Sequence, residues 1–359
     1  MGATSTNRAP LLTVDGAALT GSGAIVRQAA MFAALTGRGV HLVNARHRRP
    51  NPGLRPQHLT AVTAIRDLVG GSADGLEVGS RELTFVPGDR RPSGTYAWDI
   101  GSAGSATALS LALLPVVALT SEAQVTVEVR GGLFQDGAPS YHHLAHVLLP
   151  LVRQLGVVAH AELLRPGYVP RGGGAIRLTV EPAAHLSAVV QDRQGALRRI
   201  WGVALSSHLS RRRVSQRMAD AARERLGAIG VPVEIDEVDD ISAVQAGAAL
   251  ALFADLDGGV RLGSDGAGAP GRPAEAIGRD VAARLLEDLA AGSTVDRFAT
   301  DQIVPFAALA EGVTRLRVPA VTGHLETSAW LAELFVGARV RISDGLLEIT
   351  GAGHRGVHG

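Results

Sequence analysis

The sequence contains neither cysteine nor lysine. All 35 residues counted as lysine or arginine are arginines, and no cysteine occurs among the 359 residues. The absence of cysteine excludes structural disulfides, thiol nucleophiles and cysteine-ligated zinc. The absence of lysine excludes the lysine of a phosphate-binding P-loop, Schiff-base chemistry and nucleotidyl transfer through a lysine adduct. Any covalent intermediate must therefore form on histidine, serine, threonine, tyrosine or a carboxylate.

Long apolar runs and a strong net charge are also missing. No stretch approaches the roughly 20 apolar residues of a membrane span, and the opening MGATSTNRAPLLTV lacks the apolar centre of a signal peptide. We therefore expect no membrane segment and a cytoplasmic location. The net charge is only +1, so any contact with nucleic acid must rely on local charge. With 46% hydrophobic residues, the chain is long enough for one large domain and a smaller one.

An internal repeat organises what is present. An apolar strand leads into a glycine-rich turn and then a helix at residues 11–30, 96–114 and 260–278. The hydrophobic period predicts, in the first unit, helices 24–36 and 56–70 and strands 39–44, 76–79 and 82–86. It predicts, in the second unit, helices 104–118 and 140–155 and strands 123–130, 157–163 and 175–181. It predicts, in the third unit, helices 273–291, 300–310 and 324–336 and strands 314–318, 338–343 and 345–350.

Residues 185–258 break this rhythm. They read as a strand, the arginine-rich helix SRRRVSQRMADAARERL and two more strands, which is the content of a small α/β module. We therefore expect an α/β protein in which three βαβαββ-type repeats form a large domain with a small inserted α/β domain. The expected division is 1–184 for repeats one and two, 185–258 for the insertion, 259–350 for repeat three and 351–359 for a flexible tail.

Several segments in order resemble the RNA 3′-terminal phosphate cyclases, from about residue 10 to 350. They are LTVDGAALTGSGAIVR, ARHRRPNPGLRPQHLTAV, IGSAGSATALSLALLP, RPGYVPRGGGAI, FATDQIVPFAALAEG and VTGHLETSAWLAELF. The resemblance implies a large domain of three βαβαββ-type repeats with a small inserted domain. It also implies the ATP-dependent conversion of an RNA 3′-phosphate into a 2′,3′-cyclic phosphate, through an AMP adduct on histidine that releases pyrophosphate and then AMP.

The histidine implied by this resemblance is His324. Thr322 and Gly323 precede it as plausible cap residues, and the helix that follows would place the ring near the positive end of the helix dipole. That field opposes protonation and so favours a neutral, nucleophilic imidazole. The alternative is that His324 is an ordinary histidine in a helix cap with no catalytic role.

The matched segments imply the other site residues. Phe298, Asp301 and Gln302 resemble the stretch that holds ATP, and Pro139 matches a proline on the opposite side of the base. Planar guanidinium groups suit phosphate, so Arg27, Arg46 and Arg49 are candidates to bind phosphates, with Arg48 and Arg55 beside them. In the PGLRPQHLTAV segment, Gln57 and His58 also match the family and join this phosphate- and RNA-binding set. The turn with Gly101, Ser102, Gly104 and Ser105 opens a helix and predicts a backbone anion site.

The sequence also departs from the family. Thr20 stands where the opening turn EGGGQ carries a metal-binding glutamate, Ala24 and Leu111 replace glutamines, and Asn51 replaces a lysine. A divalent metal, Mg²⁺ or Mn²⁺, is expected with ATP, but its ligands are unknown from the sequence. Two alternatives stay open: a catalytically silent relative that binds RNA ends or ribonucleoprotein, and an enolpyruvyl transferase of similar repeat architecture.

The expected partner is the 3′-phosphate end of an RNA, with no membrane partner. The sequence leaves open the biological RNA, the oligomeric state and whether the helix at 209–227 contacts RNA or is simply solvated.

Overall fold

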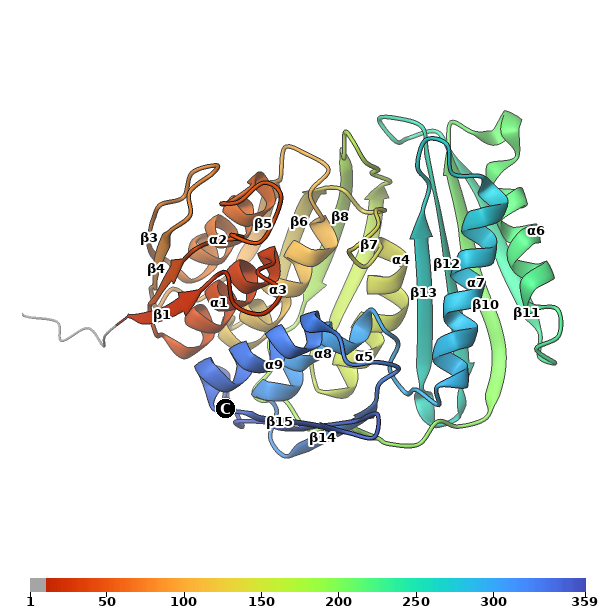
Figure 1. Ribbon diagram of the computed structural model, residues 1–359. Helices are drawn as coiled ribbons and strands as arrows, with labels where there is room; N and C mark the ends of the chain where they lie inside the picture. Colours follow the sequence, from red (N-terminus) through yellow and green to blue (C-terminus); the bar gives the residue numbers. More distant parts are fainter. Residues whose placement is uncertain (1–10) are drawn as a thin grey trace, which may run out of the picture.

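The computed structural model describes residues 11–359 and confirms the predicted α/β class (Figure 1). The described chain forms four sheets of four strands each. Within residues 11–359, no helix combines the length and the apolar character needed to cross a bilayer.

Three of these sheets share one strand order. When the strands of each sheet are numbered along the chain, they stand in the order first, second, fourth, third, with the first pair parallel and the other neighbours antiparallel. The first sheet has the order β1-β2-β4-β3, with β1 (Leu12–Asp15), β2 (Val40–Val43), β3 (Gly71–Asp74) and β4 (Leu83–Pro87). The second has the order β5-β6-β8-β7, with β5 (Gly94–Asp99), β6 (Val125–Gly131), β7 (Ala159–Arg165) and β8 (Gly174–Val180). The third has the order β9-β14-β16-β15, with β9 (Val190–Gln191), β14 (Val313–Arg317), β15 (Arg339–Ser343) and β16 (Leu346–Thr350).

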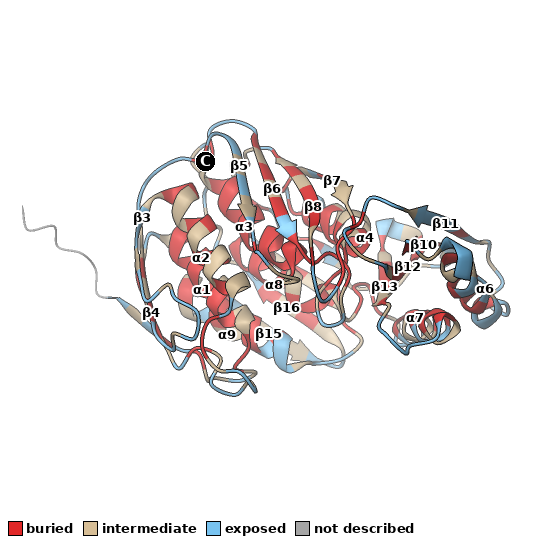
Figure 2. Cartoon of the chain, turned by 90° about the horizontal axis from the view of Figure 1, so that it is seen from above, coloured by how far each residue is buried: buried red, intermediate tan, exposed pale blue. Residues whose placement is uncertain are grey.

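The helices that belong with these three sheets lie between them (Figure 2). They are α1 (Gly23–Thr36), α2 (Pro56–Val69), α3 (Ala106–Thr120), α4 (Tyr141–His143), the π-helical turn Leu144–Leu148, α5 (Leu149–Gln154), α8 (Ala299–Leu309) and α9 (Gly323–Val336). The central helix α3 is buried on every side up to Leu119, as its uniformly apolar sequence requires. Helix α1 packs against α2, α3 and α9, and α8 packs against α9, so helices from distant segments of the chain lie together.

The fourth sheet lies beside this assembly and has its own core. Its order is β11-β10-β12-β13, with β10 (Leu197–Ser207), β11 (Val233–Asp240), β12 (Gly247–Leu256) and β13 (Arg261–Ala267). Helices α6 (Val214–Leu226) and α7 (Ala274–Ala290) pack against each other on one face of it (Figure 2). Short 3₁₀ turns lie at Ser210–Arg212 and Asp257–Gly259. A separate cluster of buried apolar residues joins these elements, among them Leu250, Leu262 and Leu285.

Three expectations are corrected here. The strand and helix predicted as the start of the third repeat are β13 and α7. Strand β13 pairs with β12 and helix α7 packs on α6, so both belong with the fourth sheet, which extends beyond residue 258. The strand predicted at 76–79 is found at Gly71–Asp74, where Gly71 adopts a φ of 100° beside Pro87. The tail predicted as flexible is attached: Gly356 N–H donates to Ala184 O and Val357 N–H to Leu119 O.

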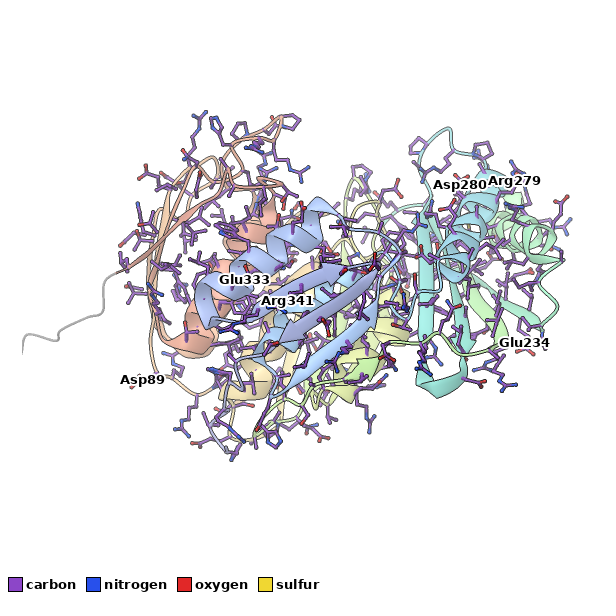
Figure 3. All side chains as sticks on the ribbon, turned by 60° about the horizontal axis from the view of Figure 1, so that its bottom comes forward. Asp89, Glu234, Arg279, Asp280, Glu333 and Arg341 are labelled. Atoms are coloured by element: carbon purple, nitrogen blue, oxygen red, sulfur yellow. The ribbon has the colours of Figure 1, made fainter. Side chains whose placement is uncertain are left out.

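Charged side chains cover both parts of the molecule on the outside. Figure 3 labels six of them, all exposed: Asp89 after β4, Glu234 on β11, Arg279 and Asp280 on α7, Glu333 on α9 and Arg341 on β15. Because acids and bases are nearly equal in number, the surface as a whole carries little net charge.

Candidate active site

One cavity of about 480 Å³ is lined by residues from seven separate segments of the described chain. Ten residues named from the sequence line it: Arg27, Arg46, Arg49, Gln57, His58, Pro139, Phe298, Asp301, Gln302 and His324. They come from α1, the loop after β2, α2, the segment before α4, the start of α8 and the start of α9. This size and mixed lining are typical of a small-molecule site.

His324 stands in the first turn of α9. The Thr322 side chain caps that helix, since its Oγ1 accepts a hydrogen bond of 3.1 Å from Leu325 N–H. The ring is open to solvent at the cavity, yet the loss of part of its hydration lowers its pKa below the usual value. The positive charges of Arg49 and Arg27 lower the pKa of His324 further. The imidazole is therefore held in its neutral, nucleophilic form.

Three of the arginines at this cavity have no carboxylate partner in the described chain. Many other arginines form ion pairs with aspartate or glutamate, but Arg27, Arg46 and Arg49 form none. Burial lowers the pKa of Arg27 to about 10, with the charge of Asp301 opposing that shift. A guanidinium in this state remains charged at neutral pH, and unpaired donors facing a cavity are suited to an anion such as phosphate.

The backbone at Arg46 is held in an unusual conformation. Its φ is 53°, in the left-handed region, which costs a non-glycine residue about 1–2 kcal/mol. Its side chain offsets that cost, because Nη1 donates to Asn51 O at 2.7 Å and to Gly53 O at 2.8 Å. The guanidinium is thereby fixed at the cavity wall rather than free in solvent. Strained conformations that the surroundings enforce are common at functional sites.

Arg48 and Arg55, which the sequence placed beside the set, do not line the cavity. Arg48 instead covers the opening turn, with Nη1 donating to Leu19 O at 2.8 Å.

His58 forms a neutral wall. It is 1% exposed, and Nδ1 accepts a 3.0 Å hydrogen bond from Arg55 N–H at the start of α2. Burial, then the charges of Arg27, Arg46 and Arg55, lower its pKa to about 3. Its ring packs so closely on the start of α1 that a Cβ at Gly23 would lie 2.0 Å from Nε2. His58 therefore does not take up a proton near neutral pH.

The start of α8 supplies the aromatic ring and a buried carboxyl group. Phe298 precedes the helix, and Asp301 and Gln302 lie in its first turn, with Gln302 Nε2 donating to Asp301 Oδ2 at 2.6 Å. Burial raises the pKa of Asp301 to about 6. Arg297 also lines the cavity and was missed, because it stands one residue before the matched segment that begins at Phe298; its guanidinium pairs with Asp288 and Glu287.

The glycine-rich turn at 101–105 supports the cavity from behind and does not line it. Three of its N–H groups already donate within the protein: Gly101 to Asp99 Oδ1, Gly104 to Ser102 Oγ and Ser105 to Gln57 Oε1. The expected anion site of free N–H groups is therefore wrong for these three. The turn instead fixes Gln57, and Ser105 caps α3 by accepting from Ala108 N–H.

The residues of the cavity do not fit a resident divalent ion. Among the described residues that line it, Asp301 is the only carboxylate, and Arg27, Arg46, Arg49 and Arg297 share the lining. Within residues 11–359, no group of three or more histidine, aspartate or glutamate side chains is arranged to hold a metal. Thr20, at the position of the expected glutamate, donates to Ser22 Oγ at 3.1 Å and lies 3.0 Å from Thr327 Oγ1. It serves to attach the opening turn to α9.

Comparison with known proteins decides the family. The sequence pattern described as "RTC: RNA 3'-terminal phosphate cyclase" matches residues 18–342. The chain belongs to the RNA 3′-terminal phosphate cyclase family. It is 35% identical over 339 residues to the RNA 3′-terminal phosphate cyclase of Pyrococcus furiosus, covering 94% of this chain and 97% of the relative. It is 37% identical to that of Pyrococcus abyssi (91% and 94% covered) and to that of Caldivirga maquilingensis (92% and 94% covered).

A solved structure, that of the enolpyruvyl transferase NikO from Streptomyces tendae, aligns with a TM-score of 0.23 and 12% identity over 97% of this chain and 53% of that one. A similarity this low carries no conclusion about this cyclase-family chain.

Two of the positions that depart from the cyclase pattern, Ala24 and Leu111, lie close together, and Ala24 also lines the main cavity. Ala24 and Leu111 line a small void of about 20 Å³ beside Arg27 and Gln302. Apolar side chains thus stand beside Arg27 at the two positions where the resemblance implied glutamine.

Proposed function

We propose that this chain is an ATP-dependent RNA 3′-phosphate cyclase that works through an AMP adduct on His324. The observation that carries the proposal is the meeting of His324 with unpaired arginines and an aromatic ring in one cavity. The relatives at 35–37% identity bear the cyclase name, and they are matched over nearly their whole length.

The first step attaches AMP to the protein. The neutral His324 ring nitrogen attacks the α-phosphorus of ATP, a nitrogen–phosphorus bond forms and the bond to the pyrophosphate oxygen breaks. Arg27, Arg46 and Arg49 offset the negative charge that builds on the phosphoryl oxygens. Phe298 and Pro139 lie on the two sides of the adenine, and Asp301 and Gln302 hold the sugar side of the nucleotide.

The second and third steps use the RNA end. An oxygen of the RNA 3′-phosphate attacks the adduct phosphorus, which frees His324 and leaves an RNA–AMP anhydride. The neighbouring 2′-hydroxyl then attacks the 3′-phosphorus, loses its proton to solvent and expels AMP. Because the cavity residues do not fit a resident metal, no step is assigned to one.

A second candidate is a catalytically silent relative that binds RNA ends. The apolar residues Ala24 and Leu111 beneath Arg27 favour it, because each lost hydrogen bond to a nucleotide is worth about 1 kcal/mol. His324 itself, neutral and open to solvent, favours the enzyme.

The two are separated by the product. Incubated with ATP, an RNA bearing a 3′-phosphate becomes resistant to phosphatase if the chain is a cyclase. The matched control is the same RNA with a 2′-deoxy terminal sugar, which has no nucleophile for the last step and stops at the anhydride. A protein that binds both RNAs and alters neither is the silent relative.

The same proposal includes the architecture. The three sheets with the same strand order are the three βαβαββ repeats, and residues from β10 to α7 form the insertion between β9 and α8. The cavity then draws His324 and Phe298 from the repeat that carries the insertion, and Arg27 from the first.

A further inference from the structure

The segment that carries Phe298 is attached to the rest of the molecule through one buried carboxylate, Asp296. Asp296 is 0% exposed and accepts hydrogen bonds from four donors. Two of them are local, Phe298 N–H at 2.9 Å and Ala299 N–H at 2.8 Å. The others are distant in sequence: His143 Nε2, 3.0 and 3.1 Å from the two carboxylate oxygens, and Gly263 N–H on β13 at 2.8 Å.

His143 connects the same carboxylate to Pro139. The backbone N–H of His143 donates a 3.1 Å hydrogen bond to Oγ of Ser140, which caps α4. Pro139 directly precedes that serine. The carbonyl of Pro139 accepts a 2.6 Å hydrogen bond from Oγ1 of Thr107, which attaches Pro139 to α3. The His143 ring also meets Phe298 edge to face, with centroids 5.8 Å apart and planes at 78°. The pair His143 and Asp296 therefore joins both flanks of the expected base position.

Phe298 needs such an attachment because its side chain lines two cavities. A second cavity, of about 260 Å³, shares Phe298, Arg297, Gly137 and Ala138 with the first and extends toward β13 and α7. Packing therefore does not hold the ring from every side. The backbone bonds to Asp296 and the edge contact with His143 supply the missing constraint.

The charges of the pair are matched. Burial alone acts to lower the pKa of His143, but the charge of Asp296 and its hydrogen bond outweigh burial, so the pKa is raised above its usual value. Burial acts to raise the pKa of Asp296, and the charge and hydrogen bond of His143 outweigh it, so that pKa is lowered. A buried ion pair with further hydrogen bonds is costly to break from one side, because it leaves an unpaired buried charge.

We infer that His143 and Asp296 are positioning residues for the nucleotide base, which set the gap between Phe298 and Pro139 and link it to β13. The inference rests on the proposed nucleotide site but not on the chemistry at His324. It predicts that loss of the pair weakens the binding of the base and leaves phosphate binding at Arg27, Arg46 and Arg49 unchanged.

The test compares two probes on the full chain by calorimetry: AMP, which carries the base, and inorganic tripolyphosphate, which does not. His143→Leu is expected to weaken AMP binding by about tenfold or more, the equivalent of one hydrogen bond of about 1.4 kcal/mol, with tripolyphosphate affinity unchanged. His143→Gln retains an N–H donor and is expected to recover part of the loss. The matched control is His146→Leu, one turn along, whose ring meets Trp201 and Phe253 rather than Asp296.

Unchanged AMP affinity in His143→Leu would overturn the inference, as would an equal loss for both probes, which indicates general damage to the site. If His143→Leu does not fold, His143→Gln and Asp296→Asn decide in the same way. Failure of the proposed function looks different: a wild-type protein that binds AMP and distinguishes these variants but forms no adduct keeps the positioning pair and loses the cyclase mechanism.

Discussion

At the scale of single residues, charge decides what His324 can do. A histidine free in water has a pKa of about 6.5, so it is partly protonated just below neutral pH. Here the loss of hydration and the charges of Arg49 and Arg27 lower the pKa of His324. Since only the neutral ring has a free electron pair for attack on phosphorus, the same arginines that attract phosphate also keep the nucleophile available.

This predicts the pH dependence of adduct formation. In the wild type, the rate should stay level down to below about pH 6.5 before protonation of His324 reduces it. Arg49→Gln removes one positive charge, so the pKa of His324 rises and the acid limb moves to higher pH. The measurement is the rate of AMP incorporation from about pH 5 to 9.

Arg315→Gln is the matched control, because Arg315 pairs with Glu348 on the third sheet and does not line the cavity. Its acid limb should coincide with the wild type. An Arg49→Gln limb that stays in place or moves to lower pH would contradict the electrostatic account of His324.

At the scale of elements, the site depends on how closely helix starts approach. Helix α1 begins at Gly23, and α2 begins beside His58, whose ring occupies the space where a side chain at 23 would stand. The two helix starts carry Arg27 and Gln57 to the same cavity. A glycine at this contact is therefore a packing requirement.

Gly23→Ala should lower the free energy of unfolding by about 1–3 kcal/mol, because the new Cβ overpacks against His58. Gly227→Ala is the control: Gly227 has a φ of −56° and its nearest heavy atom would lie 3.4 Å from the new Cβ, so its effect should stay within about 0.5 kcal/mol. Denaturant unfolding measures both. Equal stabilities for the two variants would show that the close contact is not structural.

Two arginines of helix α6 form ion pairs within the protein. Arg217 pairs with Glu275 on α7, and Arg223 pairs with Glu237 on β11. Changing both to glutamine should leave RNA affinity and its dependence on salt unaltered, whereas Arg46→Gln should reduce the salt slope by about one. A reduced slope in the α6 variant would mean that this helix binds RNA.

Helices were easier to predict than strand partners. The predicted helices 24–36, 300–310 and 324–336 begin within one residue of α1, α8 and α9, because caps and the apolar period are local signals. The strand at 260–267 carries the same glycine-rich signature as the others, but its partner is β12, and pairing is settled by contacts that no local pattern contains.

At the scale of the whole molecule, the cavity exists only because the repeats pack together. The sequence named ten of its lining residues through the resemblance of ordered segments, and it missed Arg297 and the pair His143 and Asp296. That pair joins residues 153 positions apart, a proximity that arises only from the packed fold. The sequence also predicted a divalent metal bound with ATP; among the described residues that line the cavity, Asp301 is the only carboxylate and four are arginines.

The central claim is that His324 carries AMP, and intact-mass analysis tests it most directly. The purified full chain is incubated with ATP and with Mg²⁺ or Mn²⁺ in turn, the reaction is quenched and the intact mass is measured. The variants His324→Ala and His160→Ala are treated in parallel; His160 is exposed and lies outside the cavity. The account predicts that wild type and His160→Ala gain the mass of one AMP, labile in acid, and that His324→Ala gains none. No gain in the wild type under either metal, or an equal gain in His324→Ala, would contradict it.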